Sequence, residues 1–391
     1  MKGYYRKRGD SWTFTVDIGK DPATGQRRQK SKGGFPTKKK AQEACADYIS
    51  QVSRGTYIDE DSITVKEFAK SWLQEYEELG EVKPSSVRQR EYQIRYLVED
   101  IGAMRLQSVT RKTYQDFLIR RHKSGLARNT LQNAHSAYKL LFARAVEQQL
   151  IVTDPTQYAK IPRKKESDES NDLPRYMEKE ELSRFLKVAD EGPDITGLAF
   201  RVLAYTGIRL GELCALKYSD IDFEAGTITI KRTLYNPNDL TASYELLTPK
   251  TKSSRRTFSV DPDIITRINS HRAHQNEIRM RYRDRYHDED FIFAREKSDF
   301  PGYPIVRRLL EYRIKKVLVA AGLPDHFSPH SLRHTHTSLL AEAGVPIEEA
   351  AERLGHKNDR VTRAIYLHVT KSVKRESADK FAALMATVSK M

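Results

Sequence analysis

Cysteine is scarce in this chain, with 2 among 391 residues, and long hydrophobic runs are missing from it. Cys45 and Cys214 lie far apart and form no motif, so a reducing cytoplasm is the expected compartment. No apolar run approaches the ~18 residues that a membrane span requires, which excludes membrane-spanning helices from the expected fold. The first residues, MKGYYRKRGDSW, contain no apolar stretch of the kind found in a secretory signal.

Acidic residues are too few to balance the basic ones. The sequence has 68 Lys and Arg against 53 Asp and Glu, a formal net charge of +15. This excess predicts a polyanionic partner, with nucleic acid first and a membrane surface second; a soluble protein that is merely basic is the alternative. With 391 residues, 38% hydrophobic and 31% charged, we expect a soluble, helix-rich protein of two or three domains.

Residues 1–57 are expected to form a small basic unit, since they hold 13 Lys and Arg against 5 Asp and Glu. Trp12, Phe14, Val16 and Ile18 alternate in SWTFTVDIG, which predicts a strand. The turn residues of KDPATGQ precede a second predicted strand, RRQKSKGGF, and TKKKAQEACADYISQV then has helical spacing. A small sheet with one helix and many cations can lie in a DNA groove; a solvated basic hairpin is the alternative.

Residues 63–162 have helical spacing throughout and predict a bundle of four helices. The first, in ITVKEFAKSWLQEY, begins with a capping box made by Thr64 and Glu67. The other three are predicted in KPSSVRQREYQIRYLVEDIG, TRKTYQDFLIRRHKSG and ARNTLQNAHSAYKLLFARAVEQQLI. Their outer faces are rich in Arg and Lys, which suits contact with DNA phosphates, although for any single Arg a solvated position is the simpler interpretation.

Residues 163–175 are polar and contain proline, and we interpret them as a linker to a last domain, residues 176–391. Here ITGLAFRVLAYTGIRLGELCALKYSDID predicts a helix, a break at Gly207 and another helix, while GTITIKRTLY and SRRTFSV alternate as strands. The expected fold class is mainly α with small β-sheets in three domains. These are an N-terminal β-sheet plus helix, a helical bundle and a mixed α/β domain.

Four short segments of the last domain carry side chains suited to chemistry. In TGIRLGEL, Arg209 opens a helix, where its guanidinium adds bidentate phosphate recognition to an anion-binding N-terminus. Glu212, one turn later, is interpreted as an orienting or structural carboxylate rather than a base. In TPKTKSSRR, Lys250 and Lys252 are expected on the tip of a hairpin, from which a lysine can enter a cleft and donate a proton; a solvated turn is the alternative.

In the third segment, SPHSLRHTHTSLL, Pro329 predicts a helix start, and His330 and Arg333 have the i, i+3 spacing of one helix face. His334 and His336 lie nearby. His330 and His334 have the spacing of a zinc pair, but the acid of the HExxH motif is missing and Arg333 opposes a bound cation. No carboxylate cluster suited to Mg²⁺ accompanies these segments, so we expect neither a metal nor a cofactor.

The fourth segment, LGHKNDRVTRAIYLHV, contains His356 and, ten residues later, Tyr366. A tyrosine hydroxyl is a poor nucleophile at its ordinary pKa of ~10. Cations around a phosphate would lower that barrier by stabilising both the phenolate and the pentacoordinate oxygens. A lone tyrosine is usually a packing or surface residue. The three cationic segments upstream change that interpretation, because they could bind a phosphodiester that Tyr366 attacks.

The order Arg209, Lys250, His330-x-x-Arg333, His356 and Tyr366 resembles that of the tyrosine recombinase family, above all the integrases of phages and integrative mobile elements. The three-part layout is also similar, with an arm-type DNA-binding unit, a helical SAM-like core-binding domain and a catalytic domain. The resemblance implies a site-specific DNA recombinase that cuts and rejoins DNA through a 3′-phosphotyrosine and a Holliday junction. It thereby integrates and excises a phage or mobile element without ATP or metal.

The resemblance also implies roles for these residues. Arg209 and Arg333 would clamp the scissile phosphate, and His330 and His356 would form hydrogen bonds to its oxygens. His330 would also handle the proton of the attacking tyrosine.

For the leaving group and the nucleophile, the resemblance implies that Lys250 protonates the departing 5′ oxygen and that Tyr366 attacks the phosphorus. Lys252 could occupy the same turn as Lys250 and is the alternative. The implied partners are double-stranded DNA at core-type and arm-type att sites and three further copies of the chain in a homotetramer. An excisionase and a DNA-bending host protein are further candidates, and no membrane is expected.

After Tyr366, Phe381, Ala382, Met385 and Val388 predict a C-terminal helix. We expect it to pack on a neighbouring subunit; packing on its own core is the alternative.

Two other functions compete with recombination. A topoisomerase would use the same tyrosine chemistry, but the separate basic unit and helical domain favour paired, sequence-specific sites. An architectural DNA-binding protein with an inactive site is disfavoured, since all six catalytic positions hold competent residues.

Overall fold

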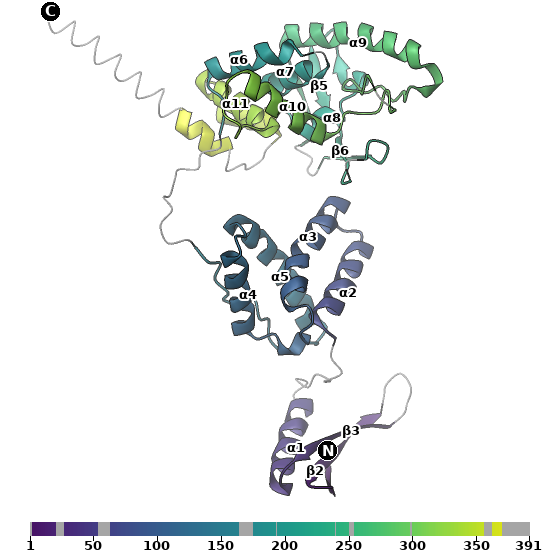
Figure 1. Ribbon diagram of the computed structural model, residues 1–391, viewed down its shortest axis with the longest axis vertical. Helices are drawn as coiled ribbons and strands as arrows, with labels where there is room; N and C mark the ends of the chain where they lie inside the picture. The colour runs from purple at the N-terminus through teal and green to yellow at the C-terminus, as the bar shows by residue number, and fades with distance from the viewer. Residues whose placement is uncertain are drawn as a thin grey trace, which may run out of the picture. The chain divides into compact units, whose positions relative to one another are not determined.

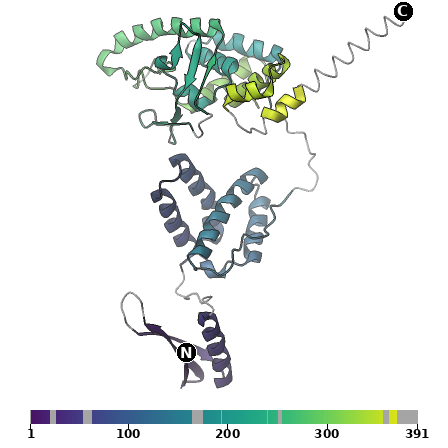
Figure 2. The ribbon, with the colours of Figure 1, turned by 180° about the vertical axis from the view of Figure 1, so that it is seen from behind.

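The computed structural model describes residues 2–20, 27–53, 63–163, 175–192, 194–238, 240–249, 254–297, 299–355 and 362–369. Contacts within the chain divide it into two compact units, Met1–Ser167 and Asp168–Met391 (Figures 1 and 2). Among the helices of these described residues, none combines the length and the apolar character that a membrane crossing needs.

The chain begins with a three-stranded antiparallel sheet in the order β1-β2-β3, formed by Gly3–Arg8, Ser11–Lys20 and Arg27–Phe35. Helix α1, Lys38–Ser53, packs on this sheet (Figure 1). The small core consists of Phe14, Val16, Cys45 and Tyr48. Strands β2 and β3 and the helix were predicted, but β1 was not, because most of its side chains are exposed and it lacks a hydrophobic alternation.

Four helices follow, as the sequence predicted: α2 Val65–Glu78, α3 Pro84–Ile101, α4 Arg111–Lys123 and α5 Arg128–Glu147, with a 3₁₀ turn η1 Leu106–Ser108 (Figure 1). The predicted capping box is present, since the Glu67 amide donates to Thr64 Oγ1 at 3.2 Å and the Thr64 amide donates to Glu67 Oε2 at 2.8 Å. The core of the bundle is rich in fully buried aromatic rings, among them Tyr114, Phe117, Tyr138 and Phe142.

The second unit surrounds a small sheet with helices. Its elements are α6 Lys179–Asp190, α7 Thr196–Thr206, α8 Leu210–Cys214, η2 Tyr218–Asp220, β4 Ile221–Asp222, β5 Thr227–Ile230, β6 Thr233–Tyr235, β7 Glu245–Leu247, β8 Arg256–Ser259, α9 Pro262–Tyr282, η4 Arg283–Arg285, α10 Arg307–Ala320, α11 Pro329–Glu342 and α12 Ile347–Leu354. A further helix covers residues 362–369. The sheet has the order β4-β5-β8, β6 pairs with β7, and α11 packs against α7.

The structure corrects the extent of one predicted strand. GTITIKRTLY forms two strands rather than one: after β5, Lys231 Nζ and Arg232 Nη2 approach Asp220 Oδ1 at 3.2 and 2.7 Å. Beyond this point β6 joins a different sheet, where it pairs with β7, while β5 pairs with β8. The predicted strands before and after the lysine segment, in GTITIKRTLY and SRRTFSV, therefore pair with each other through β5 and β8, and the β6–β7 pair lies between them in the sequence. Residues 250–253 themselves, with Lys250 and Lys252, lie outside the described residues.

Candidate active site

The site begins at the sharp change of direction between α7 and α8. Gly207 ends α7 in the left-handed region, with φ of 63°, and the side chain of Thr206 closes the turn through its hydrogen bonds to Val202 O and from the Ile208 amide. A Cβ at Gly207 would lie 2.6 Å from the His336 ring, so glycine is needed for space as well as for its dihedral angles. This is the helix break that the sequence predicted.

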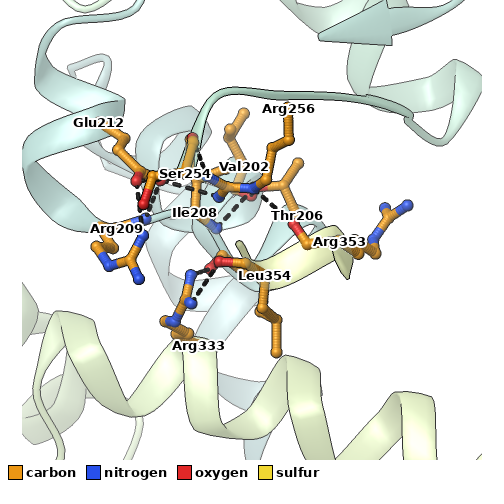
Figure 3. Close-up of polar contacts among 11 residues, drawn as sticks. Val202, Thr206, Ile208, Arg209, Glu212, Ser254, Arg256, Arg333, Arg353 and Leu354 are labelled. Carbon is orange, nitrogen blue, oxygen red and sulfur yellow. Dashed lines mark hydrogen bonds and ion pairs between the residues drawn. The ribbon is translucent and has the colours of Figure 1, made fainter. Parts of the chain in front are cut away.

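Arg209 follows the break as the residue that precedes α8, in extended backbone conformation. Its amide donates to Glu212 Oε2 at 3.0 Å, and its Nη1 donates to Glu212 Oε1 at 2.9 Å (Figure 3). The Glu212 side chain is 3% exposed while that of Arg209 is 36% exposed. Glu212 thus holds the guanidinium from the buried side, which supports its interpretation as an orienting carboxylate.

Glu212 remains ionised despite its burial. Burial raises the pKa of this carboxyl, but the charge of Arg256 and hydrogen bonds from Arg256 and the Arg209 amide outweigh that effect. The net result is a pKa below the ordinary value for glutamate. At neutral pH Glu212 is therefore an anion between two guanidinium groups, and it is poorly suited to act as a base.

Arg333 lies on α11 and is 3% exposed. Its Nη1 donates to Gly207 O, and its Nη2 donates to Leu354 O at 2.7 Å (Figure 3). These carbonyls belong to the end of α7 and the end of α12, so one buried guanidinium joins two helix C-termini, where cations are stabilised. Arg209 and Arg333, separated by 124 positions in the sequence, thereby border the same turn at Gly207.

His330 lies in the first turn of α11, as its Pro329 neighbour predicted, and its ring is exposed. It forms an edge-to-face contact with His334, with ring centroids 4.6 Å apart. The predicted i, i+3 pair thus lies on one helix, but its members differ in environment, since His330 reaches the surface and Arg333 is buried. No group of side chains suited to a metal is found among the described residues.

A cleft of about 700 Å³ connects Arg209 with His330. It is bordered by α8, β6, α10 and the start of α11, and it contains several basic side chains: Arg209, Arg307, Arg308, Lys315 and His330. The carboxylate of Glu311 is the acidic group on its wall and lies 3.8 Å from Arg307. A cleft with this balance of charge attracts a phosphate backbone.

Tyr366 lies on the helix 362–369 and is 9% exposed. It belongs to a small hydrophobic cluster with Ala341, Ala350, Ile365 and Val369. Burial raises the pKa of its phenol, and Glu348 adds to this effect, so the hydroxyl is protonated at neutral pH. Its described surroundings therefore stabilise the neutral phenol, whereas the sequence led us to expect cations that favour the phenolate. His356 lies outside the described residues.

Two polar residues of this region, Arg256 and Arg353, were missed by the sequence analysis, and a third, His336, was named there without a role. Arg256 forms a buried ion pair with Glu212, with Nη2 and Oε2 2.9 Å apart. Arg353 donates from Nε to His336 Nε2 at 3.2 Å, and His336 Nδ1 is 2.9 Å from Ala204 O. Burial lowers the pKa of His336 to about 3, with the charge of Arg353 adding to the effect, so this ring is neutral and its Nδ1 carries the proton.

A sequence signal was available for one of these residues. The strand RTFS alternates buried and exposed, and its period of two puts Arg256 on the same inward face as Phe258. An arginine on the buried face of a strand needs a partner, which points to an unrecognised carboxylate elsewhere in the chain. For His336 and Arg353 no local pattern distinguishes them from neighbouring charged residues.

Comparison with known protein families assigns three successive parts of the chain. Residues 4–52 match the arm DNA-binding domain, residues 64–120 match the phage integrase N-terminal SAM-like domain, and residues 175–372 match the phage integrase family. The fold, with its three parts and its basic cleft beside Arg209, defines a DNA-recombining enzyme of the tyrosine type. The chain belongs to the phage integrase family.

Relatives of similar length support this assignment. A tyrosine recombinase XerC-like protein of Caldanaerobacter subterraneus subsp. tengcongensis is 26% identical over 97% of this chain and 97% of its own length. The ICEBs1 integrase of Bacillus subtilis is 23% identical over 97% of this chain and 99% of its own. The transposase from transposon Tn916 of Enterococcus faecalis is 26% identical over 74% of this chain and 71% of its own.

Solved structures share the fold. The Tn1549 transposon integrase in complex with transposon right end DNA has a TM-score of 0.64 at 22% identity, covering 82% of this chain and 99% of that one. A lambda integrase dimer bound to a core site has a TM-score of 0.55 at 18% identity, covering 93% and 94%. The predicted fold class, three-domain organisation and site-specific recombinase activity are thus confirmed: the chain is a tyrosine recombinase of the integrase type, which breaks and rejoins DNA.

Proposed function

We propose that this chain recombines DNA through a covalent bond between Tyr366 and a 3′ phosphate, with Arg209 and Arg333 as the binding groups for the scissile phosphodiester. The observation that carries this proposal is the meeting of the two arginines at the turn of Gly207, beside the cleft that Arg209 shares with His330. Guanidinium groups suit this task because they bind phosphate oxygens bidentately and stabilise charge that develops in the transition state.

The chemical step exchanges one phosphodiester for another. Tyr366 Oη attacks the phosphorus, so a new bond forms from this oxygen to phosphorus while the bond from phosphorus to the 5′ oxygen breaks. The phenolic proton passes toward His330, and Lys250 supplies a proton to the departing 5′ oxygen, with Lys252 as the alternative donor. His356 would donate a hydrogen bond to a non-bridging oxygen. Religation reverses the same transfers with a different 5′ hydroxyl, and two rounds pass through a Holliday junction.

A nicked suicide duplex tests the nucleophile. Its core site can be found by sequencing the DNA on both sides of the gene, where a direct repeat would mark the junction. The wild-type chain should become covalently joined to this DNA, and Tyr366→Phe should form no adduct, because the attacking oxygen is removed. A covalent adduct with Tyr366→Phe would show that another residue is the nucleophile. Relaxation of plasmids without the repeat would favour a topoisomerase instead.

We also propose boundaries and separate tasks for the three domains. Residues 1–57 would bind arm-type sites, residues 63–162 and 176–391 would enclose the core-type site on double-stranded DNA, and residues 163–175 would link them. The small basic sheet with α1, the four-helix bundle and the division of the chain between Ser167 and Asp168 support this arrangement. Four copies would act on two duplexes, with an excisionase and a DNA-bending host protein as accessory partners, on the DNA in the cytoplasm.

Deleting residues 1–57 tests whether the first domain has its own task. The deletion should weaken integration strongly and leave adduct formation with a core-site suicide duplex almost unchanged, because cleavage needs the core-type contacts alone. Both reactions can be measured by gel on the same protein preparations. Core cleavage that falls as much as integration would contradict separable roles.

The predicted helix after Tyr366 lies among residues 370–391, outside the described chain, and its packing on a neighbouring subunit stays a prediction.

A further inference from the structure

Arg256 is a buried cation to which the proposed mechanism gives no part. It lies on β8, and its side chain is 5% exposed. The guanidinium uses all three of its nitrogens: Nε donates to Arg353 O at 2.7 Å, Nη1 to Ser254 O at 3.1 Å and Nη2 to Glu212 Oε2 at 2.9 Å (Figure 3). One side chain therefore connects three segments that are far apart in the sequence.

Each of these three partners adjoins a proposed catalytic residue. Glu212 holds the guanidinium of Arg209 through Nη1 and the backbone amide. Ser254 follows Lys250 by four positions in the sequence, and Arg353 precedes His356 by three.

The contact with α12 has a second support from the neighbouring guanidinium. Arg353 Nη1 donates to Ser259 O at 2.9 Å, which ties the end of α12 back to β8. The guanidinium carbons of Arg256 and Arg353 lie 5.7 and 5.0 Å from the centre of the Phe258 ring, within cation–π range. The end of α12, just before His356 in the sequence, is thus fixed on β8 by two arginines and one aromatic ring.

Stability alone does not account for such a charge in the interior. A buried ion pair contributes little net stability compared with apolar side chains of the same size, because both charges must leave water. Nor would lysine satisfy the same partners, since its ammonium is a single point, whereas arginine presents donors in a rigid planar fork. The arrangement instead fixes the relative positions of the three segments that contain Glu212, Ser254 and Arg353.

We propose that Arg256 is a positioning residue for DNA cleavage, which orients Arg209 through Glu212 and holds the end of α12 against β8. This inference rests on the proposed function, because it needs Arg209 to act on the scissile phosphate. A misplacement of about 1 Å in a reacting group can slow a reaction about 100-fold. Loss of Arg256 should therefore slow cleavage while the DNA-binding surface, which it does not reach, stays intact.

The test is single-turnover formation of the covalent adduct by the full chain on a nicked suicide duplex. Arg256→Gln and Arg256→Lys should each slow adduct formation about 100-fold at saturating protein. Their affinity for the uncleaved duplex should equal that of the wild type. The matched control is Arg201→Lys, which weakens another arginine–carboxylate pair of the same unit, with Asp190, and should cleave at the wild-type rate.

A second substrate tests whether the effect passes through Arg209. In this duplex a sulfur atom replaces the 5′ bridging oxygen at the scissile position, and a thiolate leaves without a proton. Because Arg209 is proposed to bind the phosphate and not to protonate the leaving group, Arg256→Gln should slow cleavage of both substrates by a similar factor. A defect that sulfur removes, or one that follows the folded fraction measured by circular dichroism, would overturn the positioning of Arg209.

The outcomes also separate this inference from the proposed function. If the wild-type chain forms no adduct that depends on Tyr366, the proposed function is wrong. If the wild type forms that adduct and Arg256→Gln forms it equally fast, the nucleophile assignment stands and the role of Arg256 is refuted.

Discussion

The helical bundle and the catalytic unit place their charges in different positions. In the bundle, Arg144 and Glu75 form an ion pair whose side chains are 38% and 32% exposed, and the interior is filled by aromatic rings. In the catalytic unit, Arg256 and Glu212 are 5% and 3% exposed. The bundle therefore follows the usual separation of apolar core and charged surface, whereas the catalytic unit has charges in its interior beside Arg209 and Arg333.

This difference indicates what each region is built to do. A charge in the interior costs free energy unless a partner offsets it, so it persists where geometry matters more than stability. In the catalytic unit the buried charges join α8, β8, α11 and α12 around one turn. Among the described residues of the bundle, the buried polar side chains are neutral, such as those of Tyr114, Tyr138 and Gln93.

The largest expected effect on stability comes from breaking the interior ion pair. Glu212→Gln leaves the Arg256 charge buried without its carboxylate and should lower the free energy of unfolding of the catalytic unit by about 3–5 kcal/mol. The matched change in the bundle is Glu75→Gln, which should leave the bundle's transition almost unmoved, because both partners there face water. Calorimetry on the full chain can follow both transitions. Equal effects at the two sites would remove the distinction between the regions.

A second effect depends on pH. Burial lowers the pKa of His336 to about 3, so between the ordinary value near 6.5 and 3 the unfolded chain binds a proton that the folded chain does not. Stability of the catalytic unit should therefore fall as the pH falls through this window, by at most about 1.4 kcal/mol per pH unit from this residue. His336→Gln should make the fall less steep, since an amide can keep both hydrogen bonds without titrating.

The bundle offers the matched control for this pH effect. Burial also lowers the pKa of His135, but this ring is half-buried whereas that of His336 is buried. His135→Gln should therefore change the pH dependence of the bundle less than His336→Gln changes that of the catalytic unit. Urea unfolding at pH 7 and pH 4.5 measures both slopes. If His336→Gln left the slope unaltered, the histidine would not be buried in its neutral form.

The smallest effect should be shared by the two regions. Tyr138 donates its hydroxyl to Gln93 O at 2.9 Å in the bundle, and Tyr218 donates to Gln275 Oε1 at 2.8 Å in the catalytic unit. Replacing either tyrosine with phenylalanine removes one neutral hydrogen bond and should cost about 1 kcal/mol. Urea unfolding of the two variants measures the pair. A loss at Tyr138 as large as that for Glu212→Gln would mean that charge is not what distinguishes the two interiors.

Much of the fold could be predicted because its signals are local. The helices of the bundle follow from the spacing of apolar residues, and the capping box at Thr64 and the break at Gly207 follow from residue types at fixed positions. The division of GTITIKRTLY between two sheets could not be predicted, because β5 pairs with β8 and β6 with β7, and these partner strands lie further along the chain. Strand β1 was missed because its exposed, polar side chains carry no hydrophobic alternation.

The candidate site divides in the same way. The sequence by itself determined which residue types stand at Arg209, His330, Arg333 and Tyr366, and their order was enough to predict a phosphate-binding enzyme with a tyrosine nucleophile. Only the tertiary structure decided which charges are buried. Arg256 forms hydrogen bonds to Glu212, 44 positions away in the sequence, and to Arg353 O, 97 positions away. Arg333 forms a hydrogen bond to Gly207 O, 126 positions away. Such pairings depend on how whole elements pack, because a guanidinium has no local preference that selects one distant carbonyl or carboxylate over another.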